Sequence, residues 1–289
     1  MLSIENSHLR AEISLQGGIL QSLRHRGAEY LWQRDAAYWG GCAPNLFPFV
    51  GRLFQGAYLL DGVRYPMDLH GFVRQSQLAV ESLSAESCTL VLTDSPRTRA
   101  CYPFAFAFRV RYQLMEATLA ITFSVENRGP VPLLCAMGGH PGFLVPLEPG
   151  LAYTDYALTF SQPSAPERVE FGPNGLCTGK RTPFPLEGGV RLPLSHDLFD
   201  QEAVFLAQAP SSITLSAGPG SRGVTVSYPQ MPYVGFWHPA RTEAPLLCIE
   251  PWSALPGREG VLEDLRTMPE RTAVPPGETV SNTWSITLF

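Results

Sequence analysis

Apolar and polar residues alternate with a period of two along most of this chain, and this alternation constrains the fold more than any other feature. Residues 7–16 and 19–26 alternate on either side of the pair Gly17-Gly18, and residues 106–129 form a longer alternating stretch. A period of two is typical of strands with one buried face, and glycine pairs mark turns. The sequence therefore predicts antiparallel hairpins.

The same pattern recurs in four further segments. Residues 57–67 carry an Asp-Gly pair between two apolar arms, which is a strong hairpin signal. Residues 76–95 and residues 213–229 each predict two strands joined by a short turn, and the chain ends on a strand over 280–289. Strands that follow one another through short turns favour an all-β architecture.

The composition supports few helices and one domain. The 289 residues include 26 Gly and 27 Pro, which would interrupt long helices, and the 45% hydrophobic content is too high for a disordered chain. Only residues 261–268 and 197–206 have a locally helical pattern. No linker or change of composition marks a boundary, so we expect one antiparallel β-sandwich domain over residues 1–289.

Charge and cysteine usage exclude several classes of protein. The net charge is −5 without a basic block, which argues against a nucleic-acid partner. No stretch approaches the ~18 apolar residues that cross a bilayer, and the N-terminus lacks the pattern of a signal peptide. The six cysteines are scattered without a C-x-x-C pair, which favours free thiols over disulfides. We expect a soluble, cytoplasmic protein without a membrane partner.

Motifs for cofactors and metals find little support. Residues 218–223 match G-x-G-x-x-G, but both flanks alternate as strands, so we expect a hairpin turn and not a dinucleotide site. The chain has no G-x-S-x-G, G-x-x-x-x-G-K-[ST] or H-E-x-x-H motif. His196 and Asp197 are adjacent, which does not aim both at one ion. We expect no cofactor and no metal.

Four segments interrupt the alternation with polar groups in apolar, Gly- and Pro-rich surroundings. They are residues 47–52 (FPFVGR), 68–74 (DLHGFVR), 138–143 (GGHPGF) and 248–253 (CIEPWS). An ionisable side chain in such surroundings is partly desolvated, and this costs free energy unless the group is paired or used. These segments are therefore the candidate functional segments.

The ionisable residues of these segments are His70, His140, Glu250, Arg52 and Arg74. Apart from Arg74, each has a purely structural alternative, since either histidine could bond to backbone in the core and Glu250 could form a buried ion pair with Arg52. Together they supply a general acid, a general base and donors for hydroxyl groups. Trp237 and Trp252 could add a flat wall for a sugar ring, or could simply pack in the core.

These motifs resemble those of the aldose 1-epimerase (galactose mutarotase) superfamily, in particular its LacX-like branch. The matching segments run in family order over essentially the whole chain and are LFPFVGRL, LHGFVR, YPFAFAFRVRYQL, GGHPGF, YVGFWHP and CIEPWSALPG. The resemblance implies the galactose mutarotase-like supersandwich, a large twisted antiparallel β-sandwich with few short helices and an open cleft. It also implies an enzyme without a cofactor that acts on a monosaccharide.

The resemblance assigns a role to each matching residue. It implies that Glu250 is the catalytic base and His140 the catalytic acid, that His70 holds substrate oxygens and that Arg52 is the cleft arginine. Glu250 would take the proton of the anomeric hydroxyl while His140 protonates the ring oxygen, which opens the ring. If the two lie close together, the charge of Glu250 should keep His140 protonated.

The family also grips sugar hydroxyls with a carboxylate that precedes a strand in the last third of the chain. Here the matching position is either Asp200 or Glu202, and the sequence leaves this choice open. It leaves the preferred sugar open as well, and the oligomeric state could be monomer or homodimer.

Two alternatives to a neutral-sugar epimerase remain. The first is a hexose-6-phosphate 1-epimerase, in which Arg52 and Arg74 would clamp the phosphate, because guanidinium groups match its geometry. The second is a carbohydrate-binding protein that keeps the cleft without turnover. The set of His70, His140 and Glu250 favours an enzyme over the second alternative.

Overall fold

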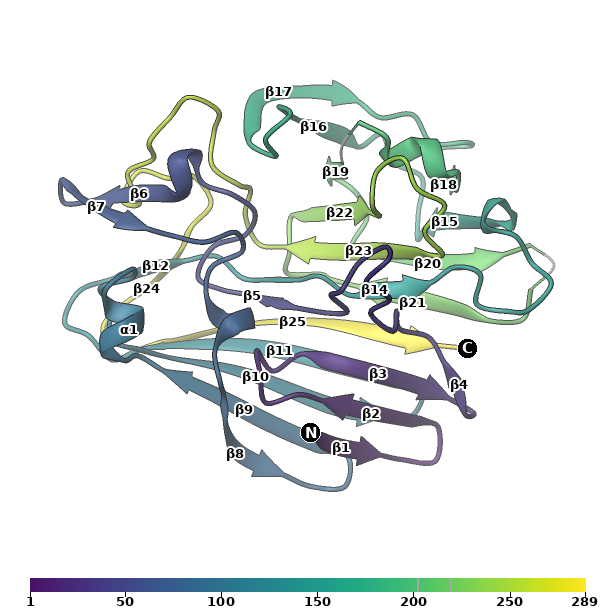
Figure 1. Ribbon diagram of the computed structural model, residues 1–289, viewed down its shortest axis with the longest axis horizontal. Coiled ribbons are helices and arrows are strands. Elements are labelled where there is room, and N and C mark those ends of the chain that lie inside the picture. Colours follow the sequence, from purple (N-terminus) through teal and green to yellow (C-terminus); the bar gives the residue numbers. More distant parts are fainter. Residues whose placement is uncertain (202, 219) are drawn as a thin grey trace.

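The computed structural model describes residues 1–201, 203–218 and 220–289, and antiparallel strands dominate it (Figure 1). One sheet has nine strands in the spatial order β18 (Arg191–Pro193), β15 (Tyr156–Phe160), β20 (Ser212–Ala217), β21 (Gly223–Ser227), β25 (Thr279–Leu288), β11 (Thr118–Asn127), β10 (Phe106–Met115), β9 (Ser87–Thr93) and β8 (Ala79–Leu83). A second sheet has eight strands: β17 (Cys177–Pro183), β16 (Glu167–Phe171), β19 (Val204–Ala207), β22 (Tyr233–Trp237), β23 (Leu246–Trp252), β13 (Gly138–Gly139), β5 (Asn45–Leu46), and β14 (Gly142–Leu144), which pairs with β23.

Smaller elements complete the chain. They are the four-stranded sheet β1 (Leu2–Glu5), β2 (Leu9–Ile13), β3 (Leu20–His25) and β4 (Ala28–Glu29), and the pairs β6 (Ala57–Leu60) with β7 (Val63–Pro66) and β12 (Leu133–Cys135) with β24 (Thr272–Val274). The helical elements are the α-helix α1 (Pro96–Arg99) and the 3-10 turns η1 (Phe54–Gly56), η2 (Val73–Gln75), η3 (Tyr153–Asp155) and η4 (His196–Phe199). The predicted all-β class with few short helices is confirmed.

The main core lies between the two large sheets. In Figure 1, β22 and β23 lie above β25 and β11, and the side chains between them form one continuous buried cluster. Phe160 of the nine-stranded sheet meets Phe236 of the eight-stranded sheet edge to face, with 6.2 Å between ring centroids. Along β10, Phe108 and Val110 are fully buried and Arg111 is exposed, as the alternation predicts.

The structure confirms the predicted hairpins and corrects the predicted helices. Residues 261–268 do not form a helix, because their backbone groups bond to β6: Leu59 N–H donates to Glu263 O at 2.7 Å, and Leu265 N–H donates to Leu59 O at 2.8 Å. Among the described residues of 197–206, only those of the single turn η4 are helical, and β19 then pairs with β22. The tertiary pairing overrides the local helical pattern in both places.

The structure also addresses the expectations about the cysteines and about membrane-spanning segments. The six cysteines are free thiols, and Cys101 is the partly exposed one while the others are buried. Among the described residues, no helix is long and apolar enough to span a membrane.

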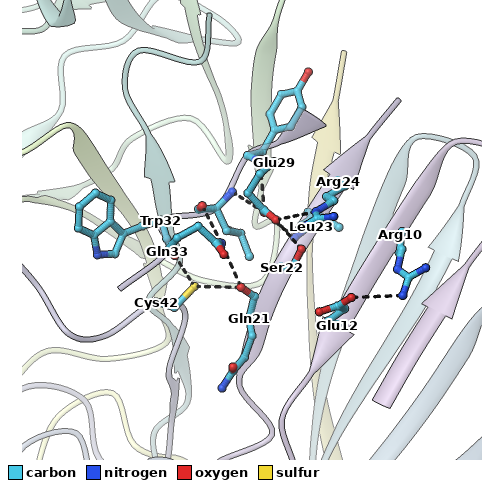
Figure 2. A network of polar contacts seen from close by, with 12 residues as sticks. Arg10, Glu12, Gln21, Ser22, Leu23, Arg24, Glu29, Trp32, Gln33 and Cys42 are labelled. Carbon is cyan, nitrogen blue, oxygen red and sulfur yellow. Dashed lines mark hydrogen bonds and ion pairs between the residues drawn. The ribbon is translucent and has the colours of Figure 1, made fainter. Parts of the chain in front are cut away.

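A polar network at the end of β3 holds the segment that follows β4 (Figure 2). The Glu29 carboxylate accepts hydrogen bonds from the backbone N–H groups of Leu23 at 2.9 Å and Leu31 at 3.1 Å, and also from the hydroxyl of Ser22. Arg24 Nε donates to the same carboxylate at 3.2 Å. Because the Glu29 side chain is only 15% exposed, the donors it satisfies have limited access to water.

We predict that Glu29→Ala lowers the free energy of unfolding by about 2 kcal/mol, because it leaves several partly buried donors without an acceptor. Glu12→Ala is the matched control, since Glu12 forms an ion pair with the exposed Arg10 at 3.3 Å (Figure 2) and should cost less than about 0.5 kcal/mol. Urea unfolding followed by circular dichroism measures both. Equal effects of the two substitutions would contradict this interpretation.

Candidate active site

The pleat of β23 sends alternate residues to opposite faces of the eight-stranded sheet. Leu247 and Ile249 belong to the main core between the sheets. Glu250 and Trp252 therefore point to the other face, where Glu250 is only 2% exposed. A carboxylate is buried here because it alternates with core residues on a central strand.

A cavity of about 360 Å³ lies on this face of the sheet. Its lining includes five of the residues singled out in the sequence, namely Arg52, His70, Arg74, His140 and Glu250. Four distant segments of the chain therefore meet in one place. The two predicted aromatic residues Trp237 and Trp252 line the same cavity.

His140 and Glu250 form the most buried pair of ionisable groups in this cavity. His140 Nε2 lies 3.4 Å from Glu250 Oε2, and their side chains are 11% and 2% exposed. Burial lowers the pKa of His140 to about 4 and raises the pKa of Glu250 well above its usual range. The expectation that Glu250 keeps His140 protonated is therefore wrong for the free protein, because burial disfavours charge on both groups.

Both pKa shifts favour the uncharged forms of the two groups. In that uncharged pair the proton resides on Glu250, and His140 is neutral. Moving it across the 3.4 Å between the two groups converts the pair into a carboxylate and an imidazolium without a change in net charge. Such a pair titrates as a unit, and it can offer one acid and one base.

His70 is fixed by a reciprocal contact with Gly51. His70 N–H donates to Gly51 O at 2.9 Å, and Gly51 N–H donates to His70 Nδ1 at 3.0 Å. Since Nδ1 accepts, the ring proton is on Nε2, which makes His70 a donor. Burial lowers the pKa of His70 well below its usual range, and the neighbouring cations Arg74 and Arg52 lower it further, so the ring is neutral.

The backbone at His70 and Gly71 is left-handed, with φ of 64° and 71°. A Cβ at Gly71 would lie 2.2 Å from the carbonyl oxygen of Phe47, so the close approach of these two segments requires glycine. The sequence HGF therefore turns the chain sharply at the cavity. Residues other than glycine that keep a positive φ are concentrated at functional sites in many proteins.

Gly139, in the segment that carries His140, must also be glycine because another part of the chain lies close to it. A Cβ at this position would lie 2.4 Å from the indole ring of Trp284 in β25. Glycine therefore lets β13 pass between β5 and β23 directly above the nine-stranded sheet. His140 follows at once and enters the cavity.

Trp39 is a lining residue that sequence reasoning missed. Its ring stacks on His140, with 5.1 Å between centroids and 26° between planes, and Trp237 meets both rings edge to face. Trp39 lies in an irregular segment outside the alternation, and the following Gly40-Gly41 is its only sequence signal. The segment is held by Trp32, whose Nε1 donates to Trp39 O at 2.7 Å and whose carbonyl accepts from the Cys42 thiol (Figure 2).

The two cavity arginines differ in the hydrogen bonds that their guanidinium groups make within the protein. Arg74 Nε donates to Leu69 O at 3.2 Å, while the described residues provide no acceptor for the Arg52 guanidinium. Both retain N–H donors for a ligand.

Asp200 does not line the cavity that contains the other predicted site residues. Its carboxylate accepts the backbone N–H of Arg241 at 3.0 Å, and it is not among the described residues that line the cavity, although Ala203 is. The other expected position, Glu202, lies outside the described residues.

One group of side chains in the described structure could hold a metal ion. A nitrogen of His140, the sulfur of Cys248 and a carboxylate oxygen of Glu250 lie within 4.8 Å of one another. Nitrogen, sulfur and oxygen ligands of this kind suit Zn²⁺. A cation there would compete with the proton of the His140–Glu250 pair.

Comparisons with known proteins agree with this fold. The family model described as aldose 1-epimerase matches residues 1–272. The plasmid-encoded protein LacX of Lactococcus lactis subsp. lactis is 32% identical over an alignment of 303 residues that covers 100% of this chain and 99% of LacX. The chain therefore belongs to the aldose 1-epimerase family.

Two solved structures share the fold over the whole chain. A galactose mutarotase related enzyme from Lactobacillus acidophilus has a TM-score of 0.95 and 31% identity, covering 100% of this chain and 97% of that one. A galactose mutarotase-like protein from Lactobacillus casei has a TM-score of 0.94 and 32% identity, with complete coverage of both. The galactose mutarotase-like sandwich predicted from the sequence is thus confirmed.

We predict that Gly71→Ala lowers the free energy of unfolding by about 3 kcal/mol or more, because it combines an unfavourable positive φ with a clash against the Phe47 carbonyl. Gly27→Ala is the matched control, since Gly27 has φ of 81° but nothing within 4 Å of an added Cβ, and it should cost about 1 kcal/mol. Chemical denaturation compares the two variants. A smaller effect at Gly71 than at Gly27 would contradict the close approach.

The shifted pKa of His140 predicts a pH-dependent stability. Its folded pKa of about 4 lies below the value of about 6.5 in the unfolded chain, so the unfolded state binds more protons between these values, and stability falls as the pH falls. Between pH 7 and pH 4, the wild type should lose about 3 kcal/mol more than His140→Gln. Urea unfolding at both pH values measures the difference, and parallel losses in the two proteins would refute the shift.

Proposed function

We propose that this protein is a cofactor-independent aldose 1-epimerase that interconverts the α and β anomers of a hexose. One observation carries the proposal: His140 and Glu250 lie 3.4 Å apart in a cavity that also contains His70 and two arginines. Mutarotation needs one proton removed and one proton supplied, and this pair has one site for each. The family membership supports a carbohydrate substrate.

In the proposed reaction, Glu250 acts as the base and His140 as the acid. Glu250 takes the proton from the anomeric O1 while His140 gives a proton to the ring oxygen O5. The C1–O5 bond breaks and C1 becomes an aldehyde. After rotation about C1–C2, O5 attacks the opposite face of C1, returns its proton to His140, and O1 recovers a proton from Glu250. Protons and electrons balance over the cycle.

The reaction starts from the carboxylate and imidazolium form of the pair. Binding of the sugar brings hydroxyl donors to the desolvated Glu250, which stabilise its carboxylate form and favour transfer of its proton to His140. The stacked Trp39 ring lies against His140 and favours the cationic form of the imidazole through the π face. The proton held in the free protein thus becomes the one that His140 delivers.

The remaining cavity residues position the sugar. His70 offers its Nε2 proton to a sugar oxygen, and Arg52 and Arg74 offer guanidinium donors to hydroxyl groups. Trp237 and Trp252 supply flat apolar surface against which a pyranose ring can lie. These contacts contribute orientation, which lowers the barrier without a further proton transfer.

A hexose 6-phosphate is the second candidate substrate. Arg52 and Arg74 line the same cavity, and two guanidinium groups can hold a phosphate. The same polarimetric assay with glucose, galactose and glucose 6-phosphate distinguishes the candidates. Acceleration of the phosphate alone favours the second substrate, and acceleration of none of the three favours a carbohydrate-binding protein without turnover.

We predict that His140→Ala and Glu250→Gln each reduce the rate of accelerated mutarotation at least 10²-fold, because each removes one proton-transfer group. His8→Ala is the matched control, since the exposed His8 side chain has no described hydrogen bond, and this variant should keep the wild-type rate. Polarimetry of the purified proteins measures the rates, and circular dichroism checks folding. Near-normal rates in a folded His140→Ala or Glu250→Gln protein would end the proposal.

A further inference from the structure

A second cavity adjoins the candidate active site. Its volume is about 570 Å³, compared with about 360 Å³ for the active-site cavity, and both linings include Arg52 and Gly175. His140 and Glu250 line the active-site cavity but not the second one. The two cavities therefore meet at Arg52 and Gly175, and the acid–base pair belongs to the first cavity alone.

Backbone hydrogen bonds hold the walls of the second cavity together. The walls come from three segments, residues 52–55, residues 173–176 in the turn between β16 and β17, and residue 259. Gly257 N–H donates to Arg52 O at 2.8 Å, and Cys177 N–H donates to Gly257 O at 2.9 Å. Glu259 N–H in turn donates to Cys177 O at 2.9 Å. Neighbouring segments are thus bonded to one another, so the cavity has fixed walls.

Three exposed polar side chains of this cavity have groups available to a ligand. They are Gln55, Asn174 and Glu259. Gln55 Oε1 accepts a hydrogen bond from Arg64 Nη2 at 3.3 Å, which leaves the Gln55 Nε2 group as a donor. The Asn174 amide and the Glu259 carboxylate make no side-chain hydrogen bond with a described residue. Because all three side chains are exposed, a ligand in the cavity can reach them.

The charges of this cavity favour a neutral ligand. Its charged lining residues are one cation, Arg52, and one carboxylate, Glu259. The carboxylate lies over the turn, because a Cβ at Gly172 would be 2.7 Å from Glu259 Oε2. A phosphate would be repelled by this carboxylate, whereas sugar hydroxyls can donate to it and can also accept from a guanidinium. Phe54 adds apolar surface beside these groups, which suits the carbon face of a sugar ring.

We propose that the substrate is a reducing disaccharide, with its anomeric unit in the active-site cavity and its second glycosyl unit in the adjoining cavity. A volume of about 360 Å³ is near the lower end of the range of about 300–1,000 Å³ for small-molecule sites, so the first cavity takes one hexose. The second unit then passes Arg52 and Gly175 and meets Gln55, Asn174 and Glu259.

This inference rests on the proposed epimerase function and names its substrate class. The chemistry is unchanged, because ring opening involves only C1, O1 and O5 of the reducing unit. A second unit linked through another hydroxyl leaves these atoms free. Its contacts add binding energy away from the reacting atoms, which raises kcat/KM for the disaccharide above that for the monosaccharide.

Polarimetry with matched sugars tests the proposal. Glucose is compared with maltose and cellobiose, and galactose with β-1,4-galactobiose, so that each disaccharide shares its reducing unit with a monosaccharide. We expect kcat/KM for at least one disaccharide to exceed that for its monosaccharide at least tenfold. Glucose 6-phosphate is measured alongside.

A double variant identifies the cavity responsible. Q55G/N174A removes two amides that line only the second cavity, and glycine suits the left-handed φ of 55° at position 55. It should lower kcat/KM for the preferred disaccharide at least fivefold and change kcat/KM for the monosaccharide less than twofold. Gln77→Ala is the matched control, since its exposed side chain lines neither cavity, and both values should stay at the wild-type level. Circular dichroism confirms folding of each variant.

The results separate this inference from the proposed function. If monosaccharides are accelerated but no disaccharide is preferred, or if glucose 6-phosphate is preferred, the disaccharide proposal is overturned and the epimerase function stands. A preference that persists unchanged in Q55G/N174A also overturns it. If no sugar is accelerated, the epimerase function fails, and calorimetric titration with the same sugars decides about the cavity. Tighter binding of a disaccharide that Q55G/N174A loses supports a two-unit ligand, and its absence overturns one.

Discussion

The rest of the site depends on the burial of one carboxylate on the central strand β23. This strand is buried on both faces, so its pleat commits Leu247 and Ile249 to the core between the sheets and turns Glu250 to the opposite side. Slipping the register by one residue would exchange the two sets and place the carboxylate in the apolar core. The hydrophobic core of the sandwich therefore fixes the position of the acid–base chemistry.

Burial of Glu250 also explains why a histidine, His140, lies next to it. An ionised carboxylate without compensation would destabilise the fold, and His140 lies 3.4 Å away with its own charge disfavoured by burial. The two groups therefore meet as an uncharged pair that contains one proton. The same desolvation that holds the proton in the free protein makes its transfer responsive to a bound sugar, since hydroxyl groups bring back the hydrogen bonds that water would supply.

Much of this organisation could be predicted from the sequence, because alternation and turn residues act locally. The hairpin around Asp61-Gly62 follows from two residues with positive φ, and the clustering of His70, His140 and Glu250 follows from family motifs. Trp39 could not be predicted, because an irregular segment has no period and its ring is placed by contacts with distant elements. The protonation of the pair was predicted wrongly, since the sequence shows that the two groups meet but not how completely both are desolvated.

Nitrogen-15 NMR of the histidine side chains tests most directly whether His140 and Glu250 share a single proton in an uncharged pair. The His140 signals are assigned by comparison with His140→Gln. An uncharged pair predicts the spectrum of a neutral imidazole at pH 7 that becomes cationic only as the pH approaches about 4. It also predicts a larger cationic fraction when a sugar is bound. An imidazolium spectrum for His140 at pH 7 in the sugar-free protein would contradict it.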